Sequence, residues 1–333
     1  MICLFVSFEV KSDILEDLNK SKNVSRLEYS LDKLIPELEL EVYGFRDRIE
    51  EFDDNHASEE FYANTLENHL ETRHKDIAHP HSHDFYLAIL FTKGSGTHEI
   101  DFKEYEVKPG ALFFLNPGQT HHWELSEDTE GYIFFHSQAF YDLHYTHNLL
   151  GRFPFYFSMH QLPVIYTESV QLDILTQLFQ NILSEYNSSF LLKKEALLSL
   201  SGLVYITATR LYPEYEDETF ITQNNYYGKF RGFEALVEQF YRDTKSPSSY
   251  ASMMYMTPRH LNRIAQSVVG KSALDVIQDR ILLEAKKMLV MHKTSFSEIA
   301  ITLGFADYAY FSRLFKKKVG QTPSEFLERY GKR

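Results

Sequence analysis

Apolar and polar residues follow two different spacings along the chain. Between about residues 60 and 165, short apolar runs alternate with turn residues. The segment HDFYLAILFTKGSGTHEIDF predicts a strand, a Gly-Ser-Gly turn and a second strand, and EYEVKPGALFFLNPGQTHHWEL predicts two more strands around Pro-Gly corners. Short strands at this regular spacing indicate an antiparallel β-barrel or sandwich.

From residue 168 onward the spacing becomes helical. SVQLDILTQLFQNILSEYN and FLLKKEALLSLSGLVYITATRL place apolar residues at i, i+3, i+4 and i+7, and Pro213 closes the second segment. Residues 168–212 are apolar enough to pair with a second copy, so they are predicted to form a helical dimerisation segment. The polar and acidic residues 213–228 are predicted to be a linker, after which helical periodicity resumes.

Two segments near the C-terminus share one plan: a short helix, a tight turn and a second helix with basic exposed positions. In the first, Thr257 is predicted to cap the second helix, with Pro258 at its first position. In the other, SFSEIAITLG predicts a helix that begins after a cap at Ser297 and ends at Gly304. A helix with one apolar face and one face of hydrogen-bond donors suits the major groove of DNA. The candidate DNA-binding residues are Thr257, Arg259, His260, Asn262, Arg263, Asp307, Tyr308, Tyr310, Arg313, Lys316 and Lys317.

The net charge of the chain is −13, which by itself argues against DNA as a partner, but the charge is unevenly distributed. Residues 228–333 hold 18 Lys and Arg against 10 Asp and Glu, a net of +8, while residues 1–227 hold 16 against 37, a net of −21. A basic module joined to an acidic partner is typical of DNA-binding proteins. The single cysteine, Cys3, excludes an internal disulfide framework and fits a reducing cytoplasm. The sequence contains neither a convincing signal peptide nor a membrane-length apolar run, so no membrane association is expected.

The C-terminal pattern resembles the AraC/XylS-type DNA-binding domain. The run IAITLGFADYAYFSRLFKKKVGQTPSEF, from Ile299 to Phe326, carries the resemblance. It implies a DNA-binding domain at 229–333, with helix-turn-helix units at about 248–270 and 297–320 joined by a rigid helix at 272–292. The first unit departs from the family pattern with Tyr255 in place of a usual glycine, Ala265 in place of phenylalanine and Ala273 in place of proline, and Ala309 replaces a frequent serine in the second.

The segment from His79 to Trp123 resembles the small cupin barrel that often serves as sensor in such regulators, through HPHSHDFYLAILFTKGSG and YEVKPGALFFLNPGQTHHW, and the sensor barrel is predicted to span residues 46–167. In metal-binding cupins a His-x-His pair, a Glu and a later His hold a divalent ion. His81, His83 and His121 match the histidines, whereas the Glu position falls at Leu87 or Ala88. The prediction is therefore an organic effector and no metal or other cofactor. The candidate effector-binding residues are His81, His83, His98, Gln119, His121 and Trp123.

The sequence thus predicts a multidomain α+β protein: an extension of unassigned role (1–45), a cupin-like antiparallel barrel, a helical dimerisation segment and an all-α double helix-turn-helix domain. The predicted function is a cytoplasmic, homodimeric transcriptional regulator of the AraC/XylS type without catalytic residues. Its expected partners are promoter DNA, a small-molecule effector and, if it activates, RNA polymerase. Two alternatives stay open: a metal-dependent cupin enzyme with an attached DNA-binding domain, and a DNA-binding dimer that needs no effector.

Overall fold

The computed structural model describes residues 60–72, 80–142, 150–212, 225–291 and 295–331. The predicted extension at 1–45 and most of the predicted linker, residues 213–224, lie outside these ranges. The strands are β1 (Phe61–Thr65), β2 (His81–Ser82), β3 (Tyr86–Lys93), β4 (Gly96–Ile100), β5 (Lys103–Val107), β6 (Ala111–Leu115), β7 (Thr120–Leu125), β8 (Glu130–His136) and β9 (Val164–Tyr166).

These strands form two antiparallel sheets, with the orders β1-β8-β3-β6-β9 and β2-β7-β4-β5. Helix α3 (Leu66–Thr72) follows β1, and α4 (Gln138–Asp142) and α5 (Pro154–Phe157) lie in the connection between β8 and β9. The predicted antiparallel sheet domain is therefore present, and the elements that follow it in the described residues are helices.

The continuous apolar run of β3 is explained by its place in the middle of the five-stranded sheet. Leu87, Ile89 and Phe91 point toward the second sheet, into the core that Trp123 also enters. Ala88 and Leu90 point the other way, into a core shared with the helices after β9. A strand that is buried on both faces loses the alternation of apolar and polar residues, because neither face contacts water.

The sequence prediction missed one strand of this region. The stretch EYEVKPGALFFLNPGQTHHWEL forms three strands, β5, β6 and β7, where two were predicted. Strand β5 is the edge of its sheet and is largely exposed. An exposed edge strand carries charged residues in place of an apolar pattern, so the segment KEYEV lacked the signal on which the prediction depended.

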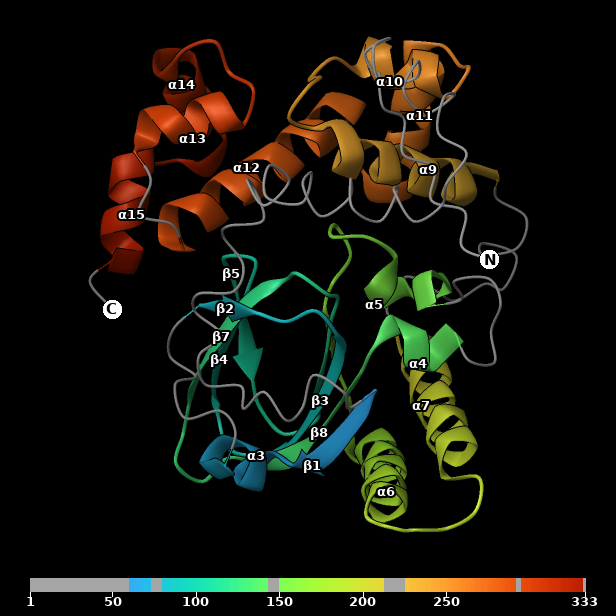
Figure 1. The fold of residues 1–333 in the computed structure, drawn as a ribbon. Helices are drawn as coiled ribbons and strands as arrows, with labels where there is room; N and C mark the ends of the chain where they lie inside the picture. The colour runs from blue at the N-terminus through green and yellow to red at the C-terminus, as the bar shows by residue number, and fades with distance from the viewer. Residues whose placement is uncertain (1–59, 73–79, 143–149, 213–224, 292–294, 332–333) are drawn as a thin grey trace, which may run out of the picture. The chain divides into compact units, whose positions relative to one another are not determined.

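The predicted helical segment consists of α6 (Ser169–Tyr186) and α7 (Lys193–Arg210), which pack on each other. Leu175 and Phe179 of α6 and Tyr205 of α7 enter the core behind the five-stranded sheet. Figure 1 shows the two helices beside β1 and β8. This buried face anchors the helices to the sheet, while part of their other surface stays exposed.

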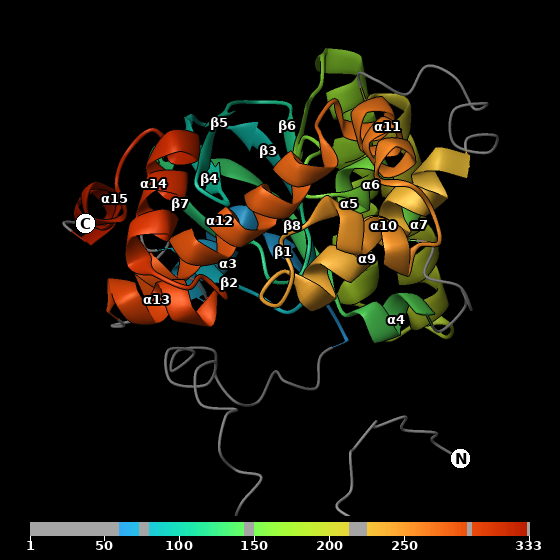
Figure 2. The same ribbon diagram turned by 90° about the horizontal axis from the view of Figure 1, so that it is seen from above.

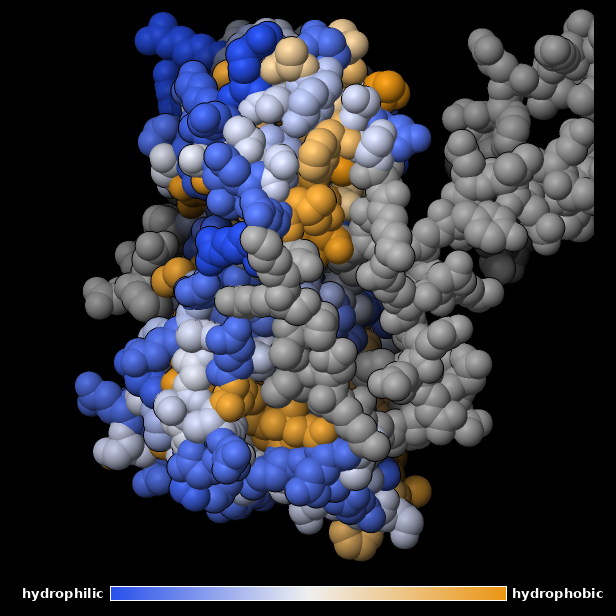
Figure 3. Space-filling view, turned by 90° about the vertical axis from the view of Figure 1, so that its left-hand side faces the viewer, coloured by the Kyte–Doolittle hydropathy of each residue, from blue (hydrophilic) through white to orange (hydrophobic). Residues whose placement is uncertain are grey.

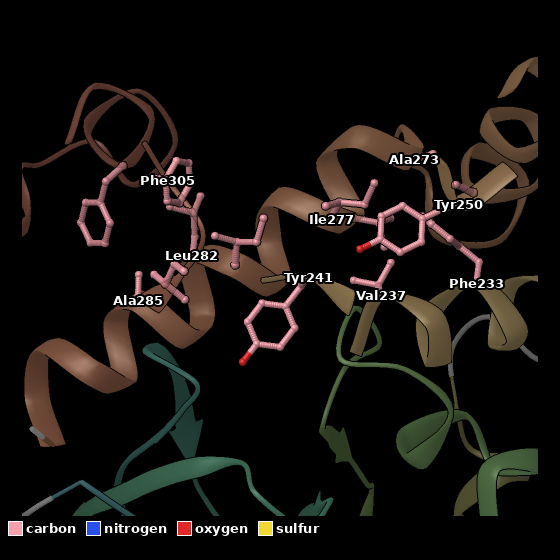
Figure 4. Packing of buried hydrophobic residues seen from close by; sticks show 14 of the residues in the cluster. Phe233, Val237, Tyr241, Tyr250, Ala273, Ile277, Leu282, Ala285 and Phe305 are labelled. Atoms are coloured by element: carbon pink, nitrogen blue, oxygen red, sulfur yellow. The ribbon is translucent and has the colours of Figure 1, made fainter. Parts of the chain in front are cut away.

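The C-terminal region consists of α9 (Asn225–Phe240), α10 (Pro247–Met253), α11 (Pro258–Val269), α12 (Ala273–Met291), α13 (Phe296–Thr302), α14 (Tyr308–Val319) and α15 (Pro323–Gly331). Helix α12 runs from α10 and α11 to the group α13–α15 (Figures 1 and 2). Its buried residues, among them Ile277, Leu282 and Ala285, pack in one core with Phe233 of α9 and Phe305 (Figure 4). One continuous core therefore ties both helix-turn-helix units to the same helix.

Helix α9 begins at Asn225, so the end of the predicted linker, residues 225–228, is helical. Tyr226 and Tyr227 pack against the core of the C-terminal region. Burial of these two aromatic rings outweighs the polar character of the surrounding sequence, on which the linker prediction depended.

Hydrophilic residues predominate on the face shown in Figure 3, and hydrophobic residues there gather in separate patches. Within the described ranges, every helix is too short or too polar to cross a membrane.

Candidate DNA interface and sensor histidines

Helix α11 is the second helix of the first unit, and its sequence determines where it begins and ends. The Thr257 hydroxyl accepts a hydrogen bond from the backbone N–H of His260 at 3.2 Å, and Pro258 occupies the first turn. Gly270 ends the helix in the left-handed conformation at φ 66°. The predicted cap is confirmed. Leu261, Ile264, Ala265 and Val268 form its buried face.

Helix α14 is the corresponding helix of the second unit. Asp307 Oδ1 accepts a hydrogen bond from Tyr310 N–H at 2.7 Å and so caps the helix, and Gly320 ends it at φ 87°. Phe311 and Phe315 are buried beneath it. Both units therefore present a helix whose N-terminus is capped by a polar side chain.

The predicted cap of α13 is wrong. The helix is capped by Ser295, whose hydroxyl accepts from the Glu298 N–H at 3.3 Å while the Glu298 carboxylate accepts from the Ser295 N–H at 2.9 Å. Ser297 lies inside the helix. The signature of this reciprocal capping box, Ser-x-x-Glu, was present in the sequence and would have identified Ser295.

Most of the predicted DNA-binding side chains are solvent-exposed on the recognition helices. The exposed residues are Thr257, Arg259, Asn262, Arg263, Asp307, Tyr310, Arg313, Lys316 and Lys317, while His260 and Tyr308 are half-buried.

Besides the caps Thr257 and Asp307, other candidates also have structural contacts. Asn262 Oδ1 accepts a hydrogen bond from the Ala273 N–H at 3.1 Å, which joins α11 to the start of α12. The Tyr308 ring stacks on Phe296. The side chains of Arg259, Arg263, Lys316 and Lys317 therefore remain the strongest candidates for direct contact with DNA.

Lys318 has a different role from its two neighbours, because its ammonium group forms an ion pair with Asp275 of α12. This contact positions the end of α14 against the connecting helix. Sequence reasoning did not anticipate it, since the two residues lie 43 positions apart.

The sensor candidates lie on neighbouring strands of the four-stranded sheet. His81 of β2 pairs with His121 of β7, and His83 follows two residues later, so the three side chains share one face. The ring centroids are 4.4 Å apart for His81 and His121, 4.9 Å for His81 and His83, and 5.2 Å for His83 and His121.

His98 and Trp123 extend this group into the core between the sheets. His98 Nε2 lies 3.1 Å from His121 Nδ1, and the His98 and Trp123 ring centroids are 5.2 Å apart. Burial lowers the pKa of His98 well below its ordinary value, so its imidazole is neutral at neutral pH. The Gln119 side chain makes other contacts than these histidine and tryptophan rings, because its amide donates to Asp101 and accepts from the Asn116 N–H.

Sequence reasoning missed a buried polar contact between the sheet and the C-terminal region. The Tyr330 hydroxyl donates to Glu99 Oε2 at 3.0 Å, and Glu99 Oε1 lies 3.7 Å from His122 Nδ1. Lys287 of α12 donates to the Gly118 carbonyl at 2.6 Å. No local sequence pattern pairs a residue of the barrel with one 231 positions later in the chain.

Two family models match the chain, in the order of its two regions. The AraC-like ligand binding domain matches residues 69–201, and the Helix-turn-helix domain matches residues 250–329. The chain is an AraC-type transcriptional regulator.

Curated proteins similar to this AraC-type regulator are transcriptional regulators themselves. The transcriptional activator RhaS of Escherichia fergusonii is 23% identical over 281 residues, 82% of this chain and 96% of that protein. The arabinose operon regulatory protein of Escherichia coli is 24% identical over 250 residues, 72% of this chain and 80% of that protein. The bifunctional transcriptional activator and DNA repair enzyme AdaA of Bacillus subtilis is 32% identical over 92 residues, 28% of this chain and 44% of that protein, so less than half of AdaA is spanned.

Proposed function

We propose that this AraC-type regulator binds promoter DNA in the cytoplasm through the N-terminal turns and exposed faces of α11 and α14. The observation that supports this most strongly is the pair of capped, basic helices on one region of net charge +8. Arg259 and Arg263 are proposed to contact bases and phosphates from α11. Lys316 and Lys317 are proposed to contact phosphates from α14.

The test of this proposal is selection of bound fragments from a genomic DNA pool by the purified full-length protein, followed by footprinting of the fragments. Sequence-specific binding gives a protected site that survives excess competitor DNA. Recovery of fragments without a common sequence would contradict the proposal.

We propose that a small organic effector binds at the ring group of His81, His83, His98, His121 and Trp123. Imidazole nitrogens next to apolar rings offer the mixture of polar and apolar contacts on which small-molecule sites depend. The hydrogen bonds from Lys287 to Gly118 and from Tyr330 to Glu99 connect the same sheet to the DNA-binding region. An effector that alters β4 or the turn before β7 would therefore alter contacts of α12 and α15.

The effector proposal is tested by thermal unfolding of the full chain with a panel of small carboxylic acids, sugars and aromatic compounds. A binder raises the Tm of the wild type and changes its affinity for the selected DNA fragment, and it has a smaller effect on the His83→Ala variant. DNA binding that responds to no compound of the panel would favour the effector-independent alternative.

We propose that α6 and α7 pair with a second copy to form a homodimer. Val170 and Ile174 lie one turn apart on α6 and are 66% and 50% exposed, and Leu203 of α7 is 49% exposed. Two-fold pairing would place four recognition helices along two half-sites.

Light scattering of the Val170→Asp, Ile174→Asp double variant should report a monomer, whereas Ser184→Asp on an exposed polar position of α6 should leave the dimer intact. A wild-type monomer at the concentrations used for DNA binding would contradict the proposal.

The proposed role is regulation without catalysis, and the similarity to transcriptional regulators supports it. Contact with RNA polymerase is proposed only for the case of activation. In-vitro transcription from the selected promoter distinguishes activation from repression, because an activator raises transcript yield with purified polymerase and a repressor lowers it.

A further inference from the structure

The segment between α9 and α10, residues 241–246, contacts both helix-turn-helix units. It leads into the first helix of the first unit, and its backbone lies against the turn of the second unit. The Arg242 carbonyl is so close to Gly304 that a Cβ on that glycine would overlap it. The turn between α13 and α14 therefore packs directly on a segment of the other unit.

The side chain of Lys245 links this segment to the turn. Its Nζ donates to the Gly304 carbonyl at 2.8 Å and to the Arg242 carbonyl at 3.1 Å. The same ammonium group lies 4.8 Å from the centroid of the Phe305 ring, whose face attracts a cation. Hydrogen bonds from a charged donor are stronger than those between neutral groups. One lysine thus connects the backbones of the two units.

The start of the segment is held on α12. Arg280 of α12 donates to both carboxylate oxygens of Glu238, at 2.5 and 2.8 Å, and to Glu284 at 2.9 Å. Its guanidinium also lies 4.2 Å from the ring centroid of Tyr241, a residue of the core that both units share. The segment cannot shift without loss of these contacts, so Lys245 acts from a fixed position.

We propose that Lys245 is a positioning residue that fixes α14 relative to α11, so that the protein accepts one spacing between the two DNA segments that these helices contact. The inference rests on the proposed DNA-binding function. Gly304 lies in the turn that sets the direction of α14, so a contact at this turn acts on that helix. One inserted base pair moves the two DNA segments apart by about 3.4 Å and rotates one of them by about 35°. A rigid pair of helices cannot follow this change.

The first experiment compares the full-length wild type with Lys245→Met on the selected DNA site and on sites with one base pair inserted between the two segments. The insertion should weaken wild-type binding by about 10- to 100-fold, because one unit loses its base contacts, and should weaken Lys245→Met binding by less than about 5-fold. Lys245→Arg keeps a cationic donor and should restore the wild-type dependence on spacing. If Lys245→Met lowered the affinity for all of these sites by one common factor, Lys245 would be a phosphate contact and the proposal would be overturned.

Lys229→Met is the matched control, because it removes a lysine from the first half of α9, away from the segment that contacts Gly304. It removes the same charge as Lys245→Met and should keep the wild-type dependence on spacing. An equal relaxation of spacing in this control would show that the effect comes from charge and would also overturn the proposal.

A second measurement needs no DNA, so failure of this inference and failure of the DNA-binding function are distinguishable. Spin labels at Ser267→Cys of α11 and Arg313→Cys of α14, both exposed positions, report the distance between the two helices in the full chain with Cys3→Ser. Dilution with unlabelled protein restricts the signal to one chain. The distance distribution should be narrow in the wild type and in Lys229→Met and should broaden in Lys245→Met. An equally narrow distribution in Lys245→Met would overturn the proposal even if DNA binding is established.

Discussion

The two helix-turn-helix units use the same turn with different residues in it. Tyr255 and Gly304 are equivalent: each follows the first helix of its unit in the left-handed conformation, at φ 54° and 71°. In both turns this residue donates to a carbonyl three residues back, and the next residue donates to one five residues back. These are the two hydrogen bonds of a Schellman motif.

The surroundings of the two turns explain the difference in residue. A Cβ added to Gly304 would lie 1.9 Å from the backbone oxygen of Arg242, whereas the Tyr255 side chain is 99% exposed. A left-handed conformation alone costs a non-glycine residue about 1–2 kcal/mol, which a stable domain tolerates. A clash between a side-chain Cβ and a neighbouring backbone oxygen costs more, because one of the two groups must move. Glycine is therefore required in the second unit and is only favourable in the first.

The largest effect is expected from Gly304→Ala. Its Cβ would overlap a carbonyl oxygen that has little freedom to move, so the free energy of unfolding of the DNA-binding region should fall by about 2–4 kcal/mol. Urea unfolding of the full chain, followed through hydrogen exchange of α13 and α14, measures it. Tyr255→Ala is the matched control and should change little, since that side chain contacts solvent. Equal losses in the two variants would contradict the comparison.

Variants in the two helix-turn-helix units should also affect DNA binding in different ways. Arg263→Ala is expected to cost about 1–3 kcal/mol of affinity for the selected site if the guanidinium contacts a base, with a smaller loss on unrelated DNA. The Lys316→Ala, Lys317→Ala double variant should weaken binding to all sequences and reduce the salt dependence of the association constant by about two units. Fluorescence anisotropy at several salt concentrations measures both. An unchanged footprint in Arg263→Ala would remove that residue from the interface.

A smaller effect is expected at the helix caps. Thr257→Ala and Asp307→Ala each remove the acceptor for one backbone N–H, and each should lower the free energy of unfolding by about 1 kcal/mol. Thr257→Ser and Asp307→Asn keep an acceptor and serve as controls that should retain most of the stability. Hydrogen exchange at the first turns of α11 and α14 locates the loss. Equal exchange rates in the alanine variants and the controls would show that the caps contribute nothing.

The helices of both units could be predicted because their signals are local. Thr257 and Pro258 mark the start of α11 within two residues, and Gly304 and Gly320 mark helix ends. The misplacement of the α13 cap at Ser297 came from neglect of the Ser-x-x-Glu signal at Ser295, so the information was available in the sequence.

Other features depend on contacts between distant residues and leave no local pattern. The Lys318–Asp275 ion pair and the Tyr330–Glu99 hydrogen bond join residues 43 and 231 positions apart. Strand β5 has no apolar alternation because it is an exposed edge. The three sensor histidines were identified from the resemblance to the cupin barrel, but the closeness of their nitrogens depends on the pairing of β2 with β7. Gln119 was grouped with them by proximity in sequence, and its side chain instead bonds Asp101.

The smallest predicted effect tests the cause of the difference between the turns. Tyr255→Gly removes the cost of the left-handed conformation, about 1–2 kcal/mol, and adds back about 0.5–1 kcal/mol of chain entropy in the unfolded state. The first unit should therefore gain at most about 1.5 kcal/mol, because an exposed side chain contributes little burial. Tyr255→Ala separates the two contributions, since alanine keeps the conformational cost and removes only the ring. Hydrogen exchange of α10 and α11 in the full chain should slow in the glycine variant alone. If alanine and glycine slowed it equally, the tyrosine ring and not the backbone conformation would be the source of the instability.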